Sequence, residues 1–259
     1  MPNTALVTGA SSGIGREFAR YHASKGGDLI VTARREDSLN TLKAELENAH
    51  DIKVTVIAQD LGSAEQAEEL YQRVTNAGLQ VDILINNAGF GGHGKFHDRD
   101  LAADLAMIDL NVKAVVTLCH RIGGDMRARG GGKILNVSST AAYMPGPLQA
   151  TYFATKAFVS SFSQALAEEL RDAGVTVTAL EPGFVETEFA DRAELNGTSL
   201  TASGATPDTV AQFGYDAMLR GKLRAVNDRK LGFAMNWVIP NMPRKQMLGM
   251  VRRMQEKKA

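Results

Sequence analysis

The feature that most constrains this chain is a regular alternation of short apolar runs, rich in β-branched residues, with longer amphipathic segments. The runs that read as strands are 5–8, 28–33, 53–58, 81–86, 132–139 and 175–182. The segments between them that read as helices are 15–26, 36–50, 63–78, about 101–129 and about 151–173. Strands that are apolar nearly throughout and separated by helices predict a doubly wound α/β fold, with a parallel sheet covered by helices on both faces.

No linker or repeat interrupts this alternation up to residue 183, so we expect a single domain over residues 1–259. After Pro182-Gly183 the chain becomes rich in turn formers and small polar residues, and about 184–215 is predicted to be a lid over a substrate site. Residues 222–228 are a candidate seventh strand. The residues from about 228 to 259 form a C-terminal extension.

The extension carries an apolar stripe at helical spacing, made of Met247, Met250, Val251 and Met254. Packing in the core or against another subunit is the first interpretation. A flexible methionine wall over an apolar substrate pocket is the second, and contact with a membrane surface is the third.

Charge and cysteine content exclude several classes of protein. The 29 basic and 29 acidic residues give a formal net charge of zero, which does not favour nucleic acid or an anionic membrane as a partner. The single cysteine, Cys119, rules out an internal disulfide and indicates a reducing compartment. The first strand begins near Thr4 and leaves no room for a signal peptide, and no run of about 18 apolar residues follows. We therefore expect a cytoplasmic protein.

The turn "TGASSGIG", Thr8 to Gly15, follows the first strand and opens the first helix. Such a turn lets the backbone approach a pyrophosphate, to which the amides at the helix N-terminus donate hydrogen bonds. We expect a dinucleotide to lie against Gly9, Ser11, Ser12, Gly13, Ile14 and Gly15. An ordinary strand-to-helix turn is the alternative.

The end of the second strand, "TARRE", indicates which dinucleotide is bound. Ala33 stands where an acidic residue would hold the ribose 2′-hydroxyl of NAD. Arg34 and Arg35 follow it and are suited to a 2′-phosphate. The sequence therefore predicts NADP(H), and solvated arginines at the start of a surface helix are the alternative.

The stretch "YFATK" places Tyr152 and Lys156 four residues apart, on one face of a helix. An ammonium about 4 Å from the phenol contributes about 4 kcal/mol at an effective dielectric near 20. This is enough to bring a phenol pKa from about 10 to about 7. The pair is predicted to be a proton donor at neutral pH.

With "NNAG" at 86–89 and "PGFVET" at 182–187, these motifs stand in an order that resembles the short-chain dehydrogenase/reductase family along nearly the whole chain. The resemblance implies a Rossmann-type sheet of about seven strands and a catalytic tetrad of Asn111, Ser139, Tyr152 and Lys156. Ser139 is chosen over Ser138 because the family serine lies thirteen residues before the tyrosine. Ser138 should then pack against a helix.

The resemblance also implies roles toward the cofactor. Asp60 would meet the adenine, although a cap for the helix near Ser63 is an alternative. Lys156 would bond the nicotinamide ribose, and Asn111 would anchor a water that joins Lys156 to solvent. The further cofactor residues are Leu61, Asn87, Ala88, Gly89, Tyr152, Pro182, Gly183 and Thr187.

The residues expected to line the substrate pocket are mostly apolar: Phe90, Tyr143, Met144, Pro145, Phe184 and Phe189. We expect transfer of a hydride between the nicotinamide and an apolar ketone or aldehyde, or a secondary alcohol, as in the hydroxysteroid-dehydrogenase-like or broad carbonyl reductase branch. A 3-oxoacyl-thioester reductase, with Arg127, Arg129 and Arg171 toward an acidic carrier protein, is one alternative. A non-catalytic NADP(H)-binding sensor or scaffold is the other.

A metal site is not expected. His93 and His97 are four residues apart, but glycines surround them and no third ligand stands near. The resemblance implies a homo-oligomer, a dimer or a tetramer. The residues after the seventh strand put the usual tetramer interface in doubt.

Overall fold

The computed structural model describes residues 3–202 and 204–257. Within them, strands in the order β3-β2-β1-β4-β5-β6-β7 form one seven-stranded parallel sheet. The strands are β1 Thr4–Thr8, β2 Asp28–Ala33, β3 Val54–Ala58, β4 Ile83–Asn86, β5 Gly132–Val137, β6 Val175–Leu180 and β7 Arg224–Ala225. The predicted doubly wound, Rossmann-type fold is confirmed.

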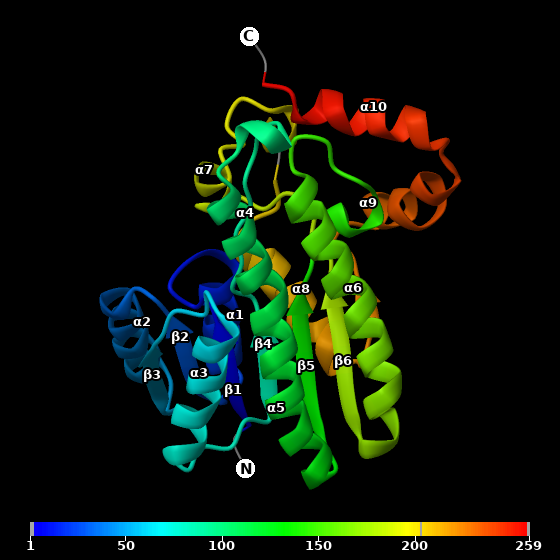
Figure 1. Cartoon of the computed structure of the whole chain (residues 1–259). Coiled ribbons are helices and arrows are strands. Elements are labelled where there is room, and N and C mark those ends of the chain that lie inside the picture. Colours follow the sequence, from blue (N-terminus) through cyan, green and yellow to red (C-terminus); the bar gives the residue numbers. More distant parts are fainter. Residues whose placement is uncertain (1–2, 203, 258–259) are drawn as a thin grey trace.

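The strand order reverses between β1 and β4. The chain runs outward from β1 to β3, returns to β4 and then continues in the other direction. At such a switch point the connections on the two sides diverge and leave a crevice outside the carboxyl ends of the strands. The fold therefore places a ligand site at the upper edge of the sheet in Figure 1.

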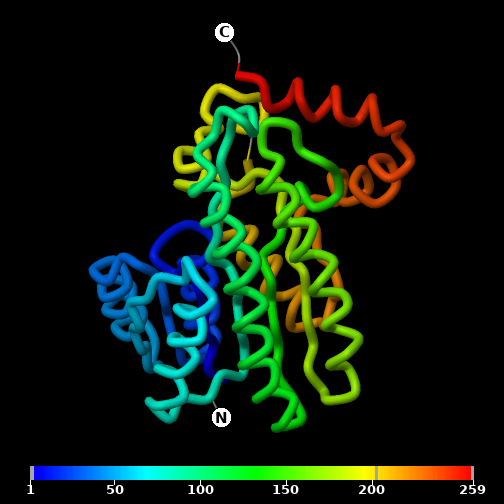
Figure 2. The backbone as a smooth tube through the Cα atoms, viewed as in Figure 1, coloured from blue at the N-terminus to red at the C-terminus, as the bar shows by residue number. Residues whose placement is uncertain are grey.

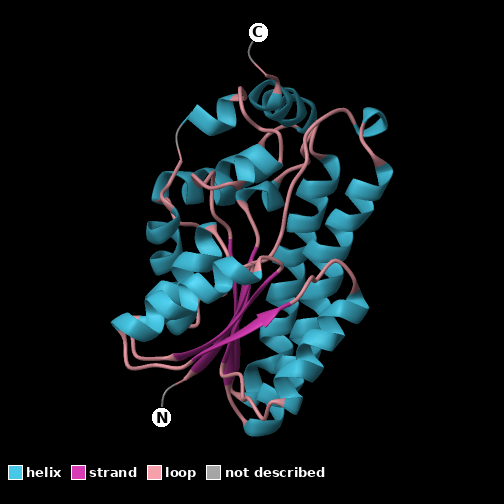
Figure 3. Cartoon of the chain, turned by 90° about the vertical axis from the view of Figure 1, so that its left-hand side faces the viewer, coloured by secondary structure: helices cyan, strands magenta, loops and turns pink. Residues whose placement is uncertain are grey.

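Helices cover both faces of the sheet (Figure 3). One face packs against α1 Gly13–Ala23, α2 Glu36–Ala49 and α8 Pro207–Leu219. The other face packs against α3 Ala64–Asn76, α5 Ala114–Arg129 and α6 Ala150–Leu170. Successive strand residues alternate between the two layers, so that Val7 packs with the first and Leu6 with the second.

The long helix predicted over about 101–129 is interrupted. It consists of α4 Leu101–Ile108, a π-helical turn at Asp109–Lys113, and α5. Turns of this kind are rare in helices and often occur at functional sites. This one contains Asn111, which is buried.

The segment after β6 differs in part from the predicted lid. It begins irregularly and contains α7 Phe189–Arg192. Residues 207–215 instead form the first part of α8, where Val210 and Tyr215 are buried against α1 and the sheet. Pro207 begins this helix at a position that tolerates proline. The described part of the irregular segment is therefore 184–202 and 204–206.

The C-terminal extension packs across the carboxyl edge of the sheet (Figures 1 and 2). It contains α9 Arg229–Phe233, a π-helical turn at Ala234–Val238 and α10 Arg244–Gln255. Met247 and Val251 of α10 are buried in a third apolar cluster, together with residues of α4 and α6. Short 3-10 turns lie at Phe96–Asp98, Thr140–Tyr143, Arg171–Ala173, Ser199–Ala202 and Ile239–Asn241.

No helix within residues 3–202 and 204–257 combines the length and the apolar character that crossing a membrane requires.

Candidate active site

A cavity of about 830 Å³ lies at the carboxyl ends of the strands, at the crevice that the topology predicts. It is lined by Ser139, Tyr152 and Lys156 of the predicted tetrad. All predicted cofactor residues except one also line it: Gly9, Ser11, Ser12, Gly13, Ile14, Arg34, Arg35, Asp60, Leu61, Asn87, Ala88, Gly89, Pro182, Gly183 and Thr187. The exception is Gly15. Asn111, the fourth tetrad residue, lies behind the cavity wall.

The glycine-rich turn is tied to the loop that follows β4. The Thr8 hydroxyl oxygen accepts hydrogen bonds from the backbone N–H groups of Asn87, at 2.9 Å, and Ala88, at 3.0 Å. The Asn87 amide donates to the Thr8 carbonyl at 3.0 Å. Thr8 was not among the predicted residues, although a hydroxyl at the end of β1 was the available signal. These bonds hold two walls of the cavity together.

Gly15 permits the close approach of α1 to this junction. A Cβ atom at this position would lie 2.3 Å from the Gly9 carbonyl oxygen and 2.4 Å from the Asn87 amide nitrogen. The Gly9 oxygen belongs to the backbone and the Asn87 amide is held by its hydrogen bond to the Thr8 carbonyl oxygen, so a side chain would displace the start of α1. The role of Gly15 is therefore to shape the turn.

The two arginines after β2 differ in their contacts. Arg35 donates to the Ser11 hydroxyl at 3.3 Å and pairs with Glu188 of the irregular segment at 3.1 Å. Arg34 is exposed and lines the cavity, and within residues 3–202 and 204–257 its side chain has no hydrogen-bond or ion-pair partner. A guanidinium without a partner beside Ala33 fits a 2′-phosphate.

Asp60 is not the cap of α3. The N-cap of that helix is Ser63, whose hydroxyl accepts from the Gln66 N–H at 3.2 Å. The Asp60 carboxylate instead accepts from the Gly62 N–H at 3.1 Å and faces the cavity beside Leu61. Its position is consistent with a contact to a nucleotide base.

The two serines after β5 face opposite ways, as the alternation of extended residues predicts. The Ser138 hydroxyl is buried and donates to the Lys156 carbonyl oxygen at 2.7 Å, which confirms that Ser138 packs against α6. Ser139 lines the cavity, accepts from the Ala141 N–H at 3.1 Å, and lies close enough to Tyr152 to oppose the rise in the pKa of its phenol. Strand β5 and helix α6 therefore bring the serine and tyrosine hydroxyls together.

The expectation that the ammonium acidifies the phenol needs correction. Burial raises the pKa of Tyr152 to about 12, and only the hydrogen bond to Ser139 opposes it. Burial lowers the pKa of Lys156 to about 8. The Lys156 Nζ donates to the Val137 carbonyl oxygen at 2.9 Å and lies 5.8 Å from the centre of the tyrosine ring. Desolvation of both side chains thus outweighs their attraction in this arrangement.

Asn111 braces the site through its amide. Its Nδ2 donates to the Phe90 carbonyl oxygen at 3.0 Å and to the Thr155 hydroxyl at 3.1 Å. Its Oδ1 accepts from the Phe90 N–H at 3.1 Å. A Cβ at Gly89 would lie 2.9 Å from that oxygen and 3.5 Å from the Lys156 Nζ, so the amide and the ammonium flank Gly89. Both amide hydrogens are engaged, and Asn111 joins the loop after β4 to α6.

The end of the cavity that is predicted to hold the substrate, here called the substrate end, is largely apolar. Phe90, Met144, Phe184 and Phe189 line it as predicted. Tyr143 and Pro145 do not: the Tyr143 hydroxyl donates to the buried carboxylate of Glu181 at 2.7 Å, and Pro145 is exposed. The wall also includes residues that sequence reasoning did not place there: Gln149, Leu195, Leu200, Met235 and Gln255.

The methionine stripe of α10 divides between two roles. Met247 is buried in the third cluster, whereas Met254 is 39% exposed and lines the cavity. The first two interpretations of the stripe therefore both hold. The stripe was the only sequence signal that pointed to this wall.

The two histidines at metal-ligand spacing, His93 and His97, lie in different surroundings. The His93 Nε2 is hydrogen-bonded to the main-chain carbonyl oxygen of Gln255 at 2.7 Å. His97 is exposed. In the described part of the chain no three side chains of His, Cys, Asp or Glu are grouped to hold a metal ion.

Comparison with known proteins gives consistent matches. A family model described as short chain dehydrogenase matches residues 3–196. The chain is 31% identical over 246 residues to the very-long-chain 3-oxoacyl-CoA reductase of Macaca fascicularis, covering 92% of this chain and 75% of that protein. It is 37% identical over 191 residues to sulfoacetaldehyde reductase 2 of Chromohalobacter salexigens, covering 73% of this chain and 75% of that protein. A solved short-chain dehydrogenase from Sphingobium yanoikuyae, in complex with NADPH, superposes with a TM-score of 0.84 at 28% identity, covering 100% of this chain and 98% of that one.

Proposed function

The chain belongs to the short-chain dehydrogenase/reductase family, and we propose that it is an NADP(H)-dependent oxidoreductase for apolar ketones or aldehydes and the matching secondary alcohols. Family membership makes it an oxidoreductase of carbonyl or alcohol groups with a nicotinamide cofactor. One observation carries the proposal. Ser139, Tyr152 and Lys156 face a single cavity that continues onto the glycine-rich turn and Arg34.

The preference for NADP(H) is supported by the surroundings of the second strand. Arg34 faces the cavity without a partner in residues 3–202 and 204–257, and Ala33 stands where NAD would require a carboxylate. The related structure that holds NADPH supports the same choice. When bound, the nicotinamide supplies or accepts the hydride.

The side chains supply the proton and hold the reacting oxygen. Tyr152, with a pKa raised to about 12, keeps its proton at neutral pH and is the proposed donor to the substrate oxygen. Ser139 hydrogen-bonds the same oxygen. Lys156 remains mostly charged below its pKa of about 8, so its ammonium favours the phenolate that the transfer leaves. Asn111 fixes the loop and the helix that carry these groups. The proposal includes a water that Asn111 anchors and that joins Lys156 to solvent.

The substrate class follows from the wall of the cavity. Four aromatic or methionine side chains border the reactive end, and α10 adds Val251 and Met254. Such a wall gains free energy by removing apolar surface from water. The relatives are named for substrates as different as a long-chain thioester and sulfoacetaldehyde, so the cavity is the better guide.

A 3-oxoacyl-thioester reductase is the second candidate, because one relative carries that name. The three arginines that were considered as a contact for an acidic carrier protein do not support this candidate. Arg127 and Arg129 end α5, and Arg171 follows α6, at the edge of the sheet opposite the cavity (Figure 1). Arg129 donates to the Val81 carbonyl oxygen and Arg171 pairs with Glu168. A non-catalytic sensor or scaffold remains the third candidate.

A panel of carbonyl compounds tests the proposal. NADPH and NADH consumption is followed with apolar ketones, aldehydes, diketones and a 3-oxoacyl-CoA thioester. We expect oxidation of NADPH in preference to NADH, with apolar ketones among the substrates. Turnover of the thioester alone would favour the second candidate. NADPH binding without oxidation across the whole panel would overturn the enzymatic assignment.

A further inference from the structure

Two buried glutamine side chains stand in the cavity wall without hydrogen-bond partners. Gln255, at the end of α10, is fully buried, and neither Oε1 nor Nε2 of its amide has a partner in residues 3–202 and 204–257. Gln149, before α6, is 2% exposed, and its Nε2 also has no partner in that part of the chain. Buried amides are nearly always hydrogen-bonded, and an exception that lines a cavity indicates a missing partner.

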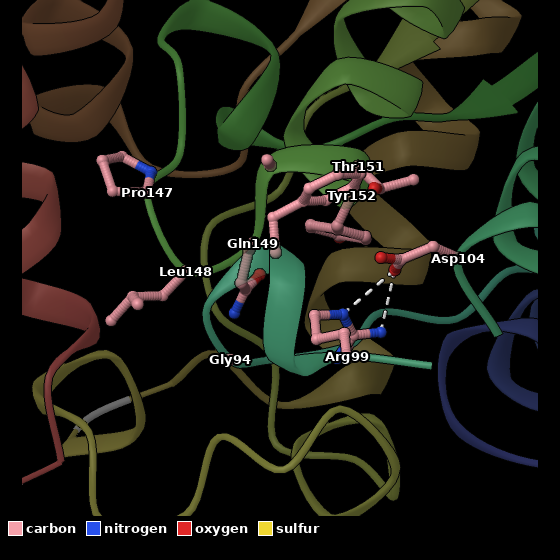
Figure 4. A pocket seen from close by; sticks show the side chains of 11 residues that line it. Gly94, Arg99, Asp104, Pro147, Leu148, Gln149, Thr151 and Tyr152 are labelled. Carbon is pink, nitrogen blue, oxygen red and sulfur yellow. Dashed lines mark hydrogen bonds and ion pairs between the residues drawn. The ribbon is translucent and has the colours of Figure 1, made fainter. Parts of the chain in front are cut away.

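Both glutamines are lining residues of the same cavity, and their amide atoms are buried behind its surface. Gln255 and Gln149 border the 830 Å³ cavity that contains Ser139 and Tyr152. Gln149 also borders an adjoining cavity of about 190 Å³. Figure 4 shows the smaller cavity, where the Gln149 amide is directed into the space between Leu148 and Arg99.

The backbone around both residues is fixed by one loop, the loop that follows β4. His93 is hydrogen-bonded to the main-chain oxygen of Gln255 at 2.7 Å, and the N–H of Gly94 donates to the Leu148 carbonyl oxygen at 2.9 Å. Leu148 has a φ of +70°, which is strained for a leucine and precedes Gln149 directly. The main chain therefore holds each amide in the wall.

The surroundings of the amides are apolar and carry no net charge. Met235, Val251 and Met254 border the same part of the wall. The nearest ion pair, Arg99 with Asp104, is closed at 2.9 Å with both side chains largely buried (Figure 4). An ionised ligand would find no unpaired opposite charge in these side chains. A neutral polar group finds both a donor and an acceptor in a glutamine amide.

We infer that Gln149 and Gln255 form a subsite for an uncharged polar group, a hydroxyl or a carbonyl, which the substrate carries at a distance from its reacting carbonyl. The inference rests on the proposed function and narrows it. The preferred substrate is a hydroxyketone or a diketone with an apolar connection between its two oxygens. The apolar wall binds the connection, and the amides select the far oxygen.

Matched pairs of substrates test the subsite. The probes are linear methyl ketones of about six to twelve carbons, a series that varies the distance between the two ends, each with and without a terminal hydroxyl. The values of kcat/KM with NADPH are measured for the wild type, for Gln255→Leu and Gln149→Leu, and for the control Gln246→Leu on the exposed face of α10. Leucine keeps the approximate volume and removes the amide.

We expect the wild type to prefer the hydroxyketone at one or more chain lengths by about 10- to 100-fold, the usual cost of leaving buried polar groups unpaired. Gln255→Leu should abolish most of this preference and retain turnover of the parent ketone, with Gln149→Leu acting in the same direction. Gln246→Leu should match the wild type. The same preference in wild type and both cavity variants would overturn the subsite, and so would no preference at any length.

Measurements of binding affinity test the subsite separately from the proposed reaction. Calorimetric affinities for the same pairs, measured with NADP⁺ present, require no turnover. If no ketone is reduced, the proposed function fails, while tighter binding of a hydroxyketone by the wild type than by Gln255→Leu still supports the subsite. Equal binding of both members of every pair excludes it. If the two amides bind only water, both members of every pair should bind equally.

Discussion

The two ends of the cavity are built by different means. The end proposed for the cofactor, here called the cofactor end, is formed by short turns after β1 to β4, where the Thr8 hydroxyl and the Asn87 amide form hydrogen bonds with the backbone across the junction. The substrate end is formed by the irregular segment and by α10, where methionine and phenylalanine side chains from distant segments pack together.

Because the two ends are built differently, substitutions at each end should have different effects. A new side chain at the cofactor end alters the backbone itself, because Gly15 leaves no room for a Cβ. A new side chain in α10 alters the volume and polarity of a wall whose backbone remains in place. Substrate choice is therefore expected to vary independently of cofactor binding, and the experiments below test that separation.

The largest effect is expected at Tyr152, where the two ends meet. Tyr152→Phe should lower kcat by about 100- to 10,000-fold, the usual contribution of a general acid. NADPH affinity, measured by fluorescence titration, should change little because the ring remains in place. The control is Tyr71→Phe in α3, outside the cavity. Turnover retained in Tyr152→Phe would remove the tyrosine from the reaction.

A deletion in the third cluster should act on the substrate end. Met247→Ala leaves a void at a residue that is 1% exposed, with an expected cost of about 2–5 kcal/mol to the packing of α10. Hydrogen exchange should increase in α10, and KM for ketones should rise more than the NADPH dissociation constant. Leu70→Ala, on the buried face of α3, should instead lower the melting temperature without this selectivity. Equal losses of ketone and NADPH binding by Met247→Ala would contradict the independence of the two ends of the cavity.

The buried ammonium should make stability depend on pH. Lys156 has a pKa of about 8 in the folded chain against an ordinary value of 10.5, so the unfolded chain holds more protons between these values and stability rises with pH. This contribution is present above about 10.5 and lost as pH falls through about 8. Its full size is about 3 kcal/mol.

The difference between wild type and Lys156→Met isolates this contribution, since other groups that titrate there cancel. Urea unfolding at about pH 7 and about pH 10 measures it. A difference independent of pH would show that the ammonium is not desolvated.

A methyl group at the glycine turn should affect the cofactor end alone. Gly15→Ala places a Cβ 2.3 Å from the Gly9 carbonyl oxygen, and overpacking of this kind costs about 1–3 kcal/mol. NADPH affinity should fall by about 5- to 150-fold, as read by titration. Gly249→Ala is the matched control in α10, where the nearest atom to a Cβ is 3.6 Å away, in the Arg253 side chain, and alanine should stabilise the helix by up to about 1 kcal/mol. Unchanged NADPH affinity in Gly15→Ala would contradict the close approach.

The smallest effect concerns the choice between coenzymes. Arg34→Asp should shift the ratio of kcat/KM for NADPH to that for NADH by about 10- to 100-fold toward NADH, because a charged hydrogen-bond partner is lost and a repulsive one gained. Arg171→Asp, at the opposite edge of the sheet, should leave the ratio unchanged. An equal ratio in Arg34→Asp and wild type would remove the argument for NADP(H).

The sequence predicted the sheet and the cofactor end because their signals are local. Apolar runs determine the strands, and glycine spacing and the i,i+4 pair of Tyr152 and Lys156 follow from the geometry of one turn or one helix. The spacing of the family motif selected Ser139, and the alternation of extended residues then predicted that Ser138 faces a helix instead.

The substrate end was not predicted to the same extent because its contacts are distant in sequence. Gln149 and Gln255 carry no local pattern, and only the fold brings them to one cavity. The direction of Tyr143 depends on the buried carboxylate of Glu181, and that of Lys156 on the Val137 carbonyl oxygen. Rotamers of this kind are chosen by packing rather than by spacing.

The bond between His93 and the main-chain oxygen of Gln255 joins residues 162 positions apart. A ribosome delivers the partner of His93 only after every strand of the sheet has emerged, so nucleotide recognition can mature on a nascent chain before the substrate wall exists. The wall formed by α10 is thus the last part of this cavity that synthesis from the N-terminus can complete.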